Sequence, residues 1–121
     1  MPTTISGNDG VSQVQNNTIT QADLTTAILP LGVGQSWVNQ TSIRTFNTDY
    51  TNNTGRPIYV SVATYATNTG NSTYALVGGV QVNNLAILSG TINCFSFIVP
   101  AGSVYRVVTN NGTLSLWAEL R

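Results

Sequence analysis

The residues that could do chemistry in this 121-residue chain are few, because charged side chains make up only 7% of it. The four basic and four acidic residues include no lysine, and the chain has no histidine. The eight charged residues are Arg44, Arg56, Arg106, Arg121, Asp9, Asp23, Asp49 and Glu119. General acid–base catalysis uses a histidine or two closely placed carboxylates, and a serine or cysteine nucleophile uses a nearby base. The sequence therefore predicts that the protein is not an enzyme.

The scarcity of acidic side chains and the absence of histidine also limit the binding of metals and cofactors. Zinc is held by cysteine and histidine and calcium by clustered carboxylates, so the sequence predicts no metal site. The glycines in "LVGGVQV" and "LGVGQ" do not form a phosphate-binding loop, and we expect no cofactor. The single cysteine, Cys94, excludes a disulfide within the chain. Its place in the apolar run "TINCFSFIV" predicts a small buried side chain.

The charge balance also limits the partners. The formal net charge is zero, so four scattered arginines cannot form the basic surface that nucleic acids or anionic membranes require. No apolar run approaches the roughly 20 residues that span a bilayer. The opening "MPTTISGNDG" has neither the positive charge nor the apolar block of a secretory signal. We therefore expect a protein made in the cytoplasm, with no nucleic-acid partner and no membrane insertion.

Polar character comes instead from threonine, asparagine and serine, which make up about a third of the chain. Their amides and hydroxyls exchange hydrogen bonds with sugar hydroxyls, and aromatic rings stack on sugar rings. The stretch "ATYATNTGNSTYAL" combines these groups in an expected exposed turn, where binding residues tend to lie. It predicts a ligand-binding site made of Tyr65, Asn68, Asn71 and Tyr74. The alternative is an ordinary solvated hairpin.

The stretch "TNNTGRPIY" at 51–59 places an arginine and a proline at the mouth of an expected strand. Asparagine and glycine suit a turn with positive φ, and Pro57 suits the first residue of a strand. Arg56 can cover apolar surface with its stem while its guanidinium reaches a carboxylate. We predict a structural ion pair between Arg56 and Asp49 or Glu119. The alternative is a ligand-binding arginine.

The elements that would hold these residues follow from hydrophobic periodicity. "RPIYVSVATY" puts Ile58, Val60 and Val62 on one face of a strand, and "TLSLWAELR" puts Trp117 and Glu119 on the face opposite its leucines. Further strands are expected at 36–46, 74–82, 85–88, 92–99 and 104–109, with turns rich in asparagine and glycine between them. This spacing predicts an all-β fold, an antiparallel β-sandwich or jelly roll, over residues 31–121.

Residues 1–30 differ from the rest and predict an N-terminal arm with one short helix, at about 20–29. Thr20 and Asp23 have the spacing of a capping box, and Pro30 with Gly32 would end the helix. A helix this short is marginal alone. We therefore expect the arm to dock on its own domain or on another subunit.

The segments "LGVGQSWVNQTSIRTFNTDYTNNTGRPIYVSV", "IVPAGSVYRV" and "LSLWAELR" occur in this order over residues 31–121. Together they resemble the C-terminal domains of bacteriophage fibre and spike proteins. The N-terminal "TTISGNDGVSQVQNNTITQADL" is similar to a connecting segment in such proteins. The resemblance implies a β-sandwich module of the virion, usually trimeric, on the exterior of the particle and often concerned with host-surface recognition. It implies that the matching positions build the domain, namely Arg44, Tyr50, Asn52, Gly55, Arg56 and Pro57.

Two functions agree with these observations. The first is a non-enzymatic tail fibre or spike, a homotrimer that binds a host-surface glycan. The second is a head fibre or a capsid or tail decoration protein, anchored on a larger virion protein by residues 1–30 and without a receptor role. Both place the protein in the virion after its synthesis in the host cytoplasm. Trp117 and Tyr105, expected on outward faces, are the predicted anchors of the homotrimer interface.

Overall fold

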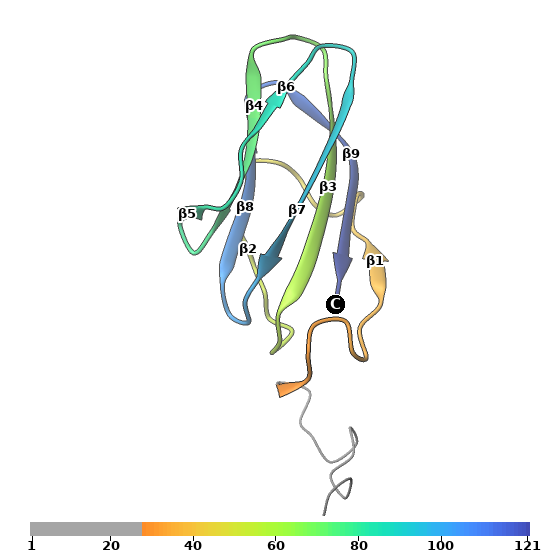
Figure 1. The fold of residues 1–121 in the computed structure, drawn as a ribbon, viewed down its shortest axis with the longest axis vertical. Coiled ribbons are helices and arrows are strands. Elements are labelled where there is room, and N and C mark those ends of the chain that lie inside the picture. The colour runs from red at the N-terminus through yellow and green to blue at the C-terminus, as the bar shows by residue number, and fades with distance from the viewer. Residues whose placement is uncertain (1–27) are drawn as a thin grey trace, which may run out of the picture.

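The computed structural model describes residues 28–121, which fold into two antiparallel β-sheets (Figure 1). Sheet A has the strand order β1-β9-β3-β7, and sheet B has the order β2-β8-β4-β5 with β6 also paired to β4. The strands are β1 (Trp37–Asn39), β2 (Tyr50–Thr51), β3 (Ile58–Ala66), β4 (Asn71–Val77), β5 (Val80–Gln81), β6 (Leu85–Ile87), β7 (Ile92–Val99), β8 (Val104–Thr109) and β9 (Gly112–Leu120). The predicted all-β antiparallel sandwich is confirmed.

Most of the expected strands are present, and β7 and β8 have the predicted bounds. The expected strand at 36–46 is wrong beyond Asn39, because the chain turns there. The backbone N–H groups of Ile43 and Arg44 both donate to the carbonyl of Gln40, and the next strand is β2. The predicted helix at 20–29 and the arm at 1–30 lie almost wholly outside the described residues.

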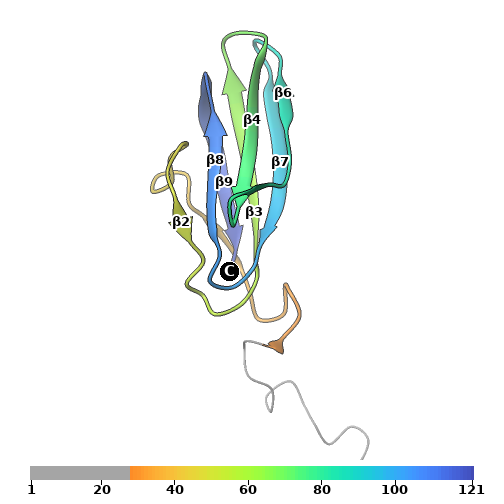
Figure 2. The same cartoon turned by 90° about the vertical axis from the view of Figure 1, so that its left-hand side faces the viewer.

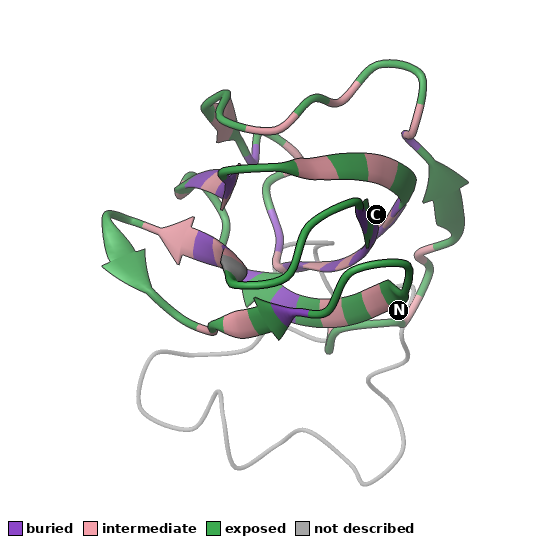
Figure 3. Cartoon of the chain, turned by 90° about the horizontal axis from the view of Figure 1, so that it is seen from above, coloured by how far each residue is buried: buried purple, intermediate pink, exposed green. Residues whose placement is uncertain are grey.

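The core lies between the two sheets and is built from their inner faces. On β3, Ile58, Val60 and Val62 are buried as the alternation predicts. Figure 3 shows this alternation as bands of buried and exposed residues along the strands. Burying one such side chain contributes about 1.5–3 kcal/mol to folding. The core residues are Ile58, Val60, Val62, Ala75, Phe97, Val99, Tyr105, Val107 and Trp117.

The C-terminal part of β9 faces the opposite way from the prediction. Trp117 is 0% exposed in the core, whereas Leu116 lies outside at 41%. The cause is a β-bulge, because the pairing with β3 shifts register between Ala63 and Thr64 and leaves Ser115 as an extra residue on β9. One extra residue reverses the inward and outward sets of a strand.

Two further expectations about exposure are wrong. Tyr105 and Trp117 were expected on outward faces as interface anchors, but both are core residues, at 1% and 0% exposed. Cys94 was expected to be buried, but it is exposed. It lies on the outward set of β7, whose inward set holds Phe95, Phe97 and Val99.

The two ends of the sandwich differ (Figures 1 and 2). The described chain begins at one end, at the bottom of Figure 1, close to the C-terminus. The β3–β4 and β6–β7 connections lie together at the other end, where the Ser89 hydroxyl donates to the Thr67 carbonyl at 2.6 Å and the Gly90 N–H donates to the Ala66 carbonyl at 2.8 Å. We call this second end, formed by residues 67–70 and 88–91, the distal end.

Candidate functional site

The structure divides the predicted ligand site between the two faces of the sandwich. Tyr65 lies on the outward set of β3 in sheet A, and Tyr74 lies on the outward set of β4 in sheet B. Asn68 lies in the connection between these strands, and Asn71 is the first residue of β4. Because the outer faces of the two sheets point in opposite directions, Tyr65 and Tyr74 are not brought together.

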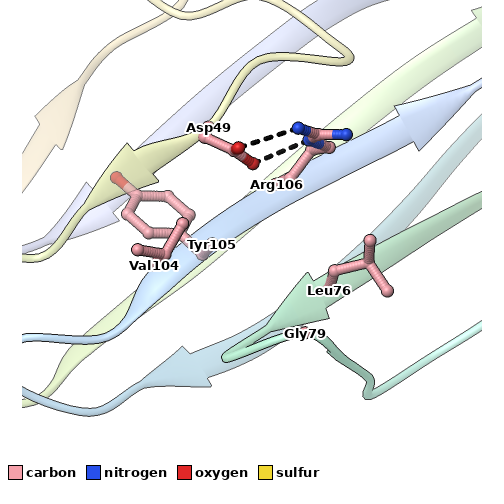
Figure 4. Close-up of a pocket in the computed structure, with 6 residues that line it drawn as sticks. All are labelled: Asp49, Leu76, Gly79, Val104, Tyr105 and Arg106. Atoms are coloured by element: carbon pink, nitrogen blue, oxygen red, sulfur yellow. Dashed lines mark hydrogen bonds and ion pairs between the residues drawn. The ribbon is translucent and has the colours of Figure 1, made fainter.

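A pocket of about 280 Å³ lies instead on the outer face of sheet B (Figure 4). Leu76 of β4 and Arg106 of β8 are partners on neighbouring strands and stand side by side across it. This volume is just below the smallest typical ligand pockets, about 300 Å³, and would hold no more than one small ring or a similar group. The lining residues are Asp49, Leu76, Gly79, Val104, Tyr105 and Arg106.

Asp49 and Arg106 form a two-point ion pair at the edge of this pocket. Arg106 Nε donates to Asp49 Oδ1 at 2.7 Å, and Nη2 donates to Oδ2 at 2.8 Å. The hydrogen bonds and the charge of Asp49 raise the pKa of Arg106 above its usual value, so the guanidinium stays charged. Both side chains remain accessible, at 57% for Asp49 and 38% for Arg106. A fixed pair of this kind offers a donor and an acceptor side by side to a third group.

Apolar groups lie next to the ion pair. Leu76 and Val104 line the pocket, and Tyr74 lies two residues before Leu76 on the same outward set of β4. Tyr74 is close enough to Arg106 to contribute to the raised pKa of that guanidinium. The pocket therefore combines a charged pair with apolar side chains and a nearby aromatic ring.

The sequence did not reveal this site. Arg106 and Asp49 are 57 residues apart, and no local pattern connects them. One signal was present, because a charged residue usually lies on the exposed side of a strand, and Arg106 shares one side of β8 with Val104 and Val108. The expectation that Tyr105 faces outward would place Arg106 on the inner side, which is wrong.

A second group of charged residues, which we call the Glu119 cluster, lies inside the sandwich. Glu119 is 0% exposed. Its Oε1 accepts hydrogen bonds from Arg44 Nε at 2.9 Å, the Tyr105 hydroxyl at 2.7 Å and Trp117 Nε1 at 3.0 Å. Its Oε2 accepts from Arg44 Nη2 at 3.2 Å and Arg121 Nη1 at 2.8 Å. Five donors satisfy this carboxylate, so it offers no free acceptor to a ligand, and loss of one partner would leave a buried charge poorly compensated.

Electrostatics in the Glu119 cluster follow from these contacts. Burial acts to raise the pKa of Glu119, but the hydrogen bonds from Arg44, Tyr105 and Trp117 and the charge of Arg44 leave that pKa below its usual value. Burial and the hydrogen bond to Glu119 raise the pKa of Tyr105 well above its usual range. The carboxylate is therefore ionised and the phenol neutral at physiological pH.

Arg56 does not form the predicted ion pair, and that prediction is wrong. Asp49 pairs with Arg106, and Glu119 pairs with Arg44 and Arg121. Arg56 is buried, and its Nη2 donates to the carbonyl of Pro30 at 2.9 Å. It therefore fastens the segment before β1 to the start of β3.

Neighbouring contacts in "TNNTGRPIY" support this attachment. The buried Asn52 amide donates to the carbonyls of Arg56 and Val99 at 2.8 and 3.0 Å, and Gly55 has the expected positive φ of 79°. Gln35 Nε2 donates to the Pro57 carbonyl at 2.9 Å. The motif is therefore a structural corner.

Other kinds of site find no support in residues 28–121. No three histidine, cysteine, aspartate or glutamate side chains in this range gather as a metal site would require. None of the described segments forms a helix that is long and apolar enough to cross a membrane. Comparison of the chain with protein-family models, curated proteins and solved structures gave no match.

Proposed function

We propose that this chain is a non-enzymatic fibre or spike protein of a bacteriophage virion, exposed on the particle, and that it binds a host-surface glycan in the pocket of sheet B. The observation that carries the proposal is the fixed Asp49–Arg106 pair beside the apolar Leu76 and Val104. The resemblance of residues 31–121 to phage fibre and spike domains supports the virion setting.

The chemistry of the pocket suits a neutral sugar. One sugar hydroxyl can donate to Asp49 while a neighbouring hydroxyl accepts from Arg106, because the two protein groups are held side by side at 2.7–2.8 Å. The C–H face of the ring can lie on Leu76 and Val104, with Tyr74 at the side. A strongly charged ligand is less suitable, because each of the two charges in the pocket is already neutralised by the other.

The rest of the surface supports the same ligand class. Hydroxyl and amide side chains dominate the polar residues, and the net charge is zero. A neutral surface of this kind does not attract polyanions or charged membranes over long range. Binding would therefore depend on short-range hydrogen bonds, which discriminate among sugars by the position of their hydroxyl groups.

The test is binding of the fluorescently labelled full-length protein to host cells and to a panel of immobilised glycans, for the wild type and Asp49→Asn. Saturable binding that falls at least about tenfold in the variant is expected, because a hydrogen bond to a charged group contributes about 1.5–3 kcal/mol. Asn111→Ala, at an exposed site in the β8–β9 turn, is the matched control and should bind as the wild type does. Equal loss in both variants, or no loss in Asp49→Asn, would contradict the proposed site.

A decoration role remains the second candidate, and one observation favours it. The described chain begins at the end opposite the distal end, where Arg56 and Gln35 fasten residues 30–36 to the domain. These hydrogen bonds would hold the domain firmly to an N-terminal arm that is bound to another protein. In this reading residues 1–30 dock on a larger virion protein. Particles that lose the protein when residues 1–27 are deleted, yet attach normally to cells, would favour decoration over glycan binding.

A further inference from the structure

Within residues 28–121, Arg56 is the one arginine that has no carboxylate partner. The other three form ion pairs, Arg44 and Arg121 with Glu119 and Arg106 with Asp49. A guanidinium in a protein is always protonated. Arg56 therefore holds a positive charge for which the described part of the chain supplies no negative one.

The charge of Arg56 is also buried. The residue is 7% exposed. Among the described residues its guanidinium has one acceptor, the Pro30 carbonyl at 2.9 Å from Nη2, and its buried Nε has no hydrogen-bond partner. A buried charge without a counter-ion is costly, and a buried donor without an acceptor is rare in folded proteins. Arg56 therefore needs an anionic acceptor that residues 28–121 do not supply.

The segment before β1 covers the guanidinium. The Pro30 carbonyl accepts hydrogen bonds from the Val33 N–H at 3.2 Å and from Arg56 Nη2, and a side chain on Gly34 would begin 3.8 Å from Nη1. A free anion would have to displace this segment to reach Arg56. The residues that precede it in the chain are already attached to it, so we expect the acceptor to come from the chain itself.

Charge is distributed unevenly along the sequence. All four arginines lie within residues 28–121 together with two of the four acids, so this part has two more positive side chains than negative ones. The other two acids, Asp9 and Asp23, lie within residues 1–27, which contain no basic side chain. The first 27 residues therefore complement the charge of the domain that follows them.

We infer that Asp23 is the carboxylate partner of Arg56 and that it accepts a hydrogen bond from the buried Nε. Asp23 lies seven residues before Pro30, which already contacts the guanidinium. Seven residues can span up to roughly 24 Å when extended, so the chain is long enough for Asp23 to return to Arg56. Asp9 lies 21 residues before Pro30, and closing that longer loop costs more chain entropy.

This ion pair would divide the first 30 residues into two parts. Residues 23–30 would belong to the domain, because Arg56 would bind at both ends of this segment. Residues 1–22 would be the part that can dock on another protein. The inference does not depend on glycan binding, because the pocket of sheet B shares no residue with the contacts of Arg56.

The first experiment measures urea unfolding of the full-length protein and of Asp23→Asn, with Asp9→Asn as the matched control. Asp23→Asn should increase the equilibrium constant for unfolding at least about tenfold, because it removes the charge that compensates a buried guanidinium. Asp9→Asn should change that constant less than about twofold. An Asp23→Asn variant as stable as the wild type, or equal effects of the two variants, overturns the inference.

A double-mutant cycle with Arg56→Met separates the ion pair from a helix-capping effect of Asp23. Methionine retains an apolar stem and removes the charge. In the Arg56→Met background, Asp23→Asn should change the unfolding constant less than about twofold, because its partner is already absent. The full tenfold effect in both backgrounds would assign Asp23 to the predicted helix cap alone and would also overturn the inference.

The Nε–H resonance of Arg56 gives a measurement that needs no substitution of Arg56. In heteronuclear NMR spectra of the full-length protein, this resonance should shift in Asp23→Asn, because its acceptor changes from a carboxylate to an amide. Asp9→Asn should leave it in place. A resonance that is unchanged in Asp23→Asn, or that moves instead in Asp9→Asn, contradicts the assignment of Asp23 even if Arg56→Met does not fold.

Discussion

The two carboxylate–guanidinium regions of this molecule use the same groups in opposite surroundings. Glu119 is wholly buried and accepts five hydrogen bonds, with two arginines and two aromatic donors around it. Asp49 meets a single arginine, Arg106, and more than half of its side chain remains accessible. The first region joins the two sheets through Tyr105 of β8 and Glu119 of β9, whereas the second lies on one sheet.

Because of this difference, the Glu119 cluster affects the stability of the fold, whereas the Asp49–Arg106 pair is accessible to a ligand. A buried carboxylate that lost a partner would leave an uncompensated charge at low dielectric, so all members of the Glu119 cluster are required together. An exposed pair adds little to stability because water competes for both groups. For the same reason Asp49 and Arg106 can exchange water for a ligand at little cost. The surroundings therefore suit the Glu119 cluster to a structural role and the Asp49–Arg106 pair to the binding role that we propose.

Glu119→Gln should have the largest effect on stability. The change removes the negative charge between Arg44 and Arg121, and breaking a buried ion pair on one side costs about 3–5 kcal/mol. That is a large part of the total stability of a small domain, about 5–15 kcal/mol. Urea unfolding followed by circular dichroism measures it, with Asp49→Asn as the matched control. A midpoint equal to that of the wild type would show that the cluster is not structural.

Acid should reproduce part of this effect in the wild type. The pKa of Glu119 is lower in the folded state than its ordinary value of 4.5, so the folded state favours the ionised form. Its contribution to stability is fully present above that value and is lost as the pH falls through the lowered pKa. The free energy of unfolding should therefore decrease below about pH 4.5. Glu119→Gln should flatten this decrease, and an unchanged acid slope in the variant would contradict the assignment.

Asp49→Asn should have the smallest effect on stability and the sharpest effect on binding. Its ion pair is exposed, so the urea midpoint and the secondary structure should match those of the wild type within error. Glycan binding is expected to fall, as set out above. A substantial loss of stability would instead place Asp49 with Glu119 as a structural residue and would remove the basis for the proposed pocket.

The sequence predicted the class of fold and most strand positions because these follow from local patterns. β7 and β8 occupy the predicted ranges, and the inward set of β3 is as predicted. The alternation of β9 gave the wrong face because a bulge at Ser115 adds one residue, and no local signal marks where pairing with β3 shifts. Glu119 lies on the same side of β9 as Trp117 and is buried with it, because its carboxylate accepts a hydrogen bond from Trp117 Nε1.

The candidate site could not be predicted for a related reason. "ATYATNTGNSTYAL" placed Tyr65 and Tyr74 near each other along the chain, but the connection between them crosses from sheet A to sheet B. Side chains close in sequence therefore face opposite sides of the molecule. The partners that do meet, Asp49 with Arg106 and Arg44 with Glu119, are 57 and 75 residues apart.

The sequence by itself determined that the chain has no histidine, no lysine and only four acidic side chains, and that its period-two segments form antiparallel strands. Those properties depend on residue types and on the alternation of side chains along a strand. Only the tertiary structure decided which acid pairs with which arginine and which aromatic residues lie inside. These features depend on register and on the packing of one sheet against the other, and both arise between segments that are distant in the chain.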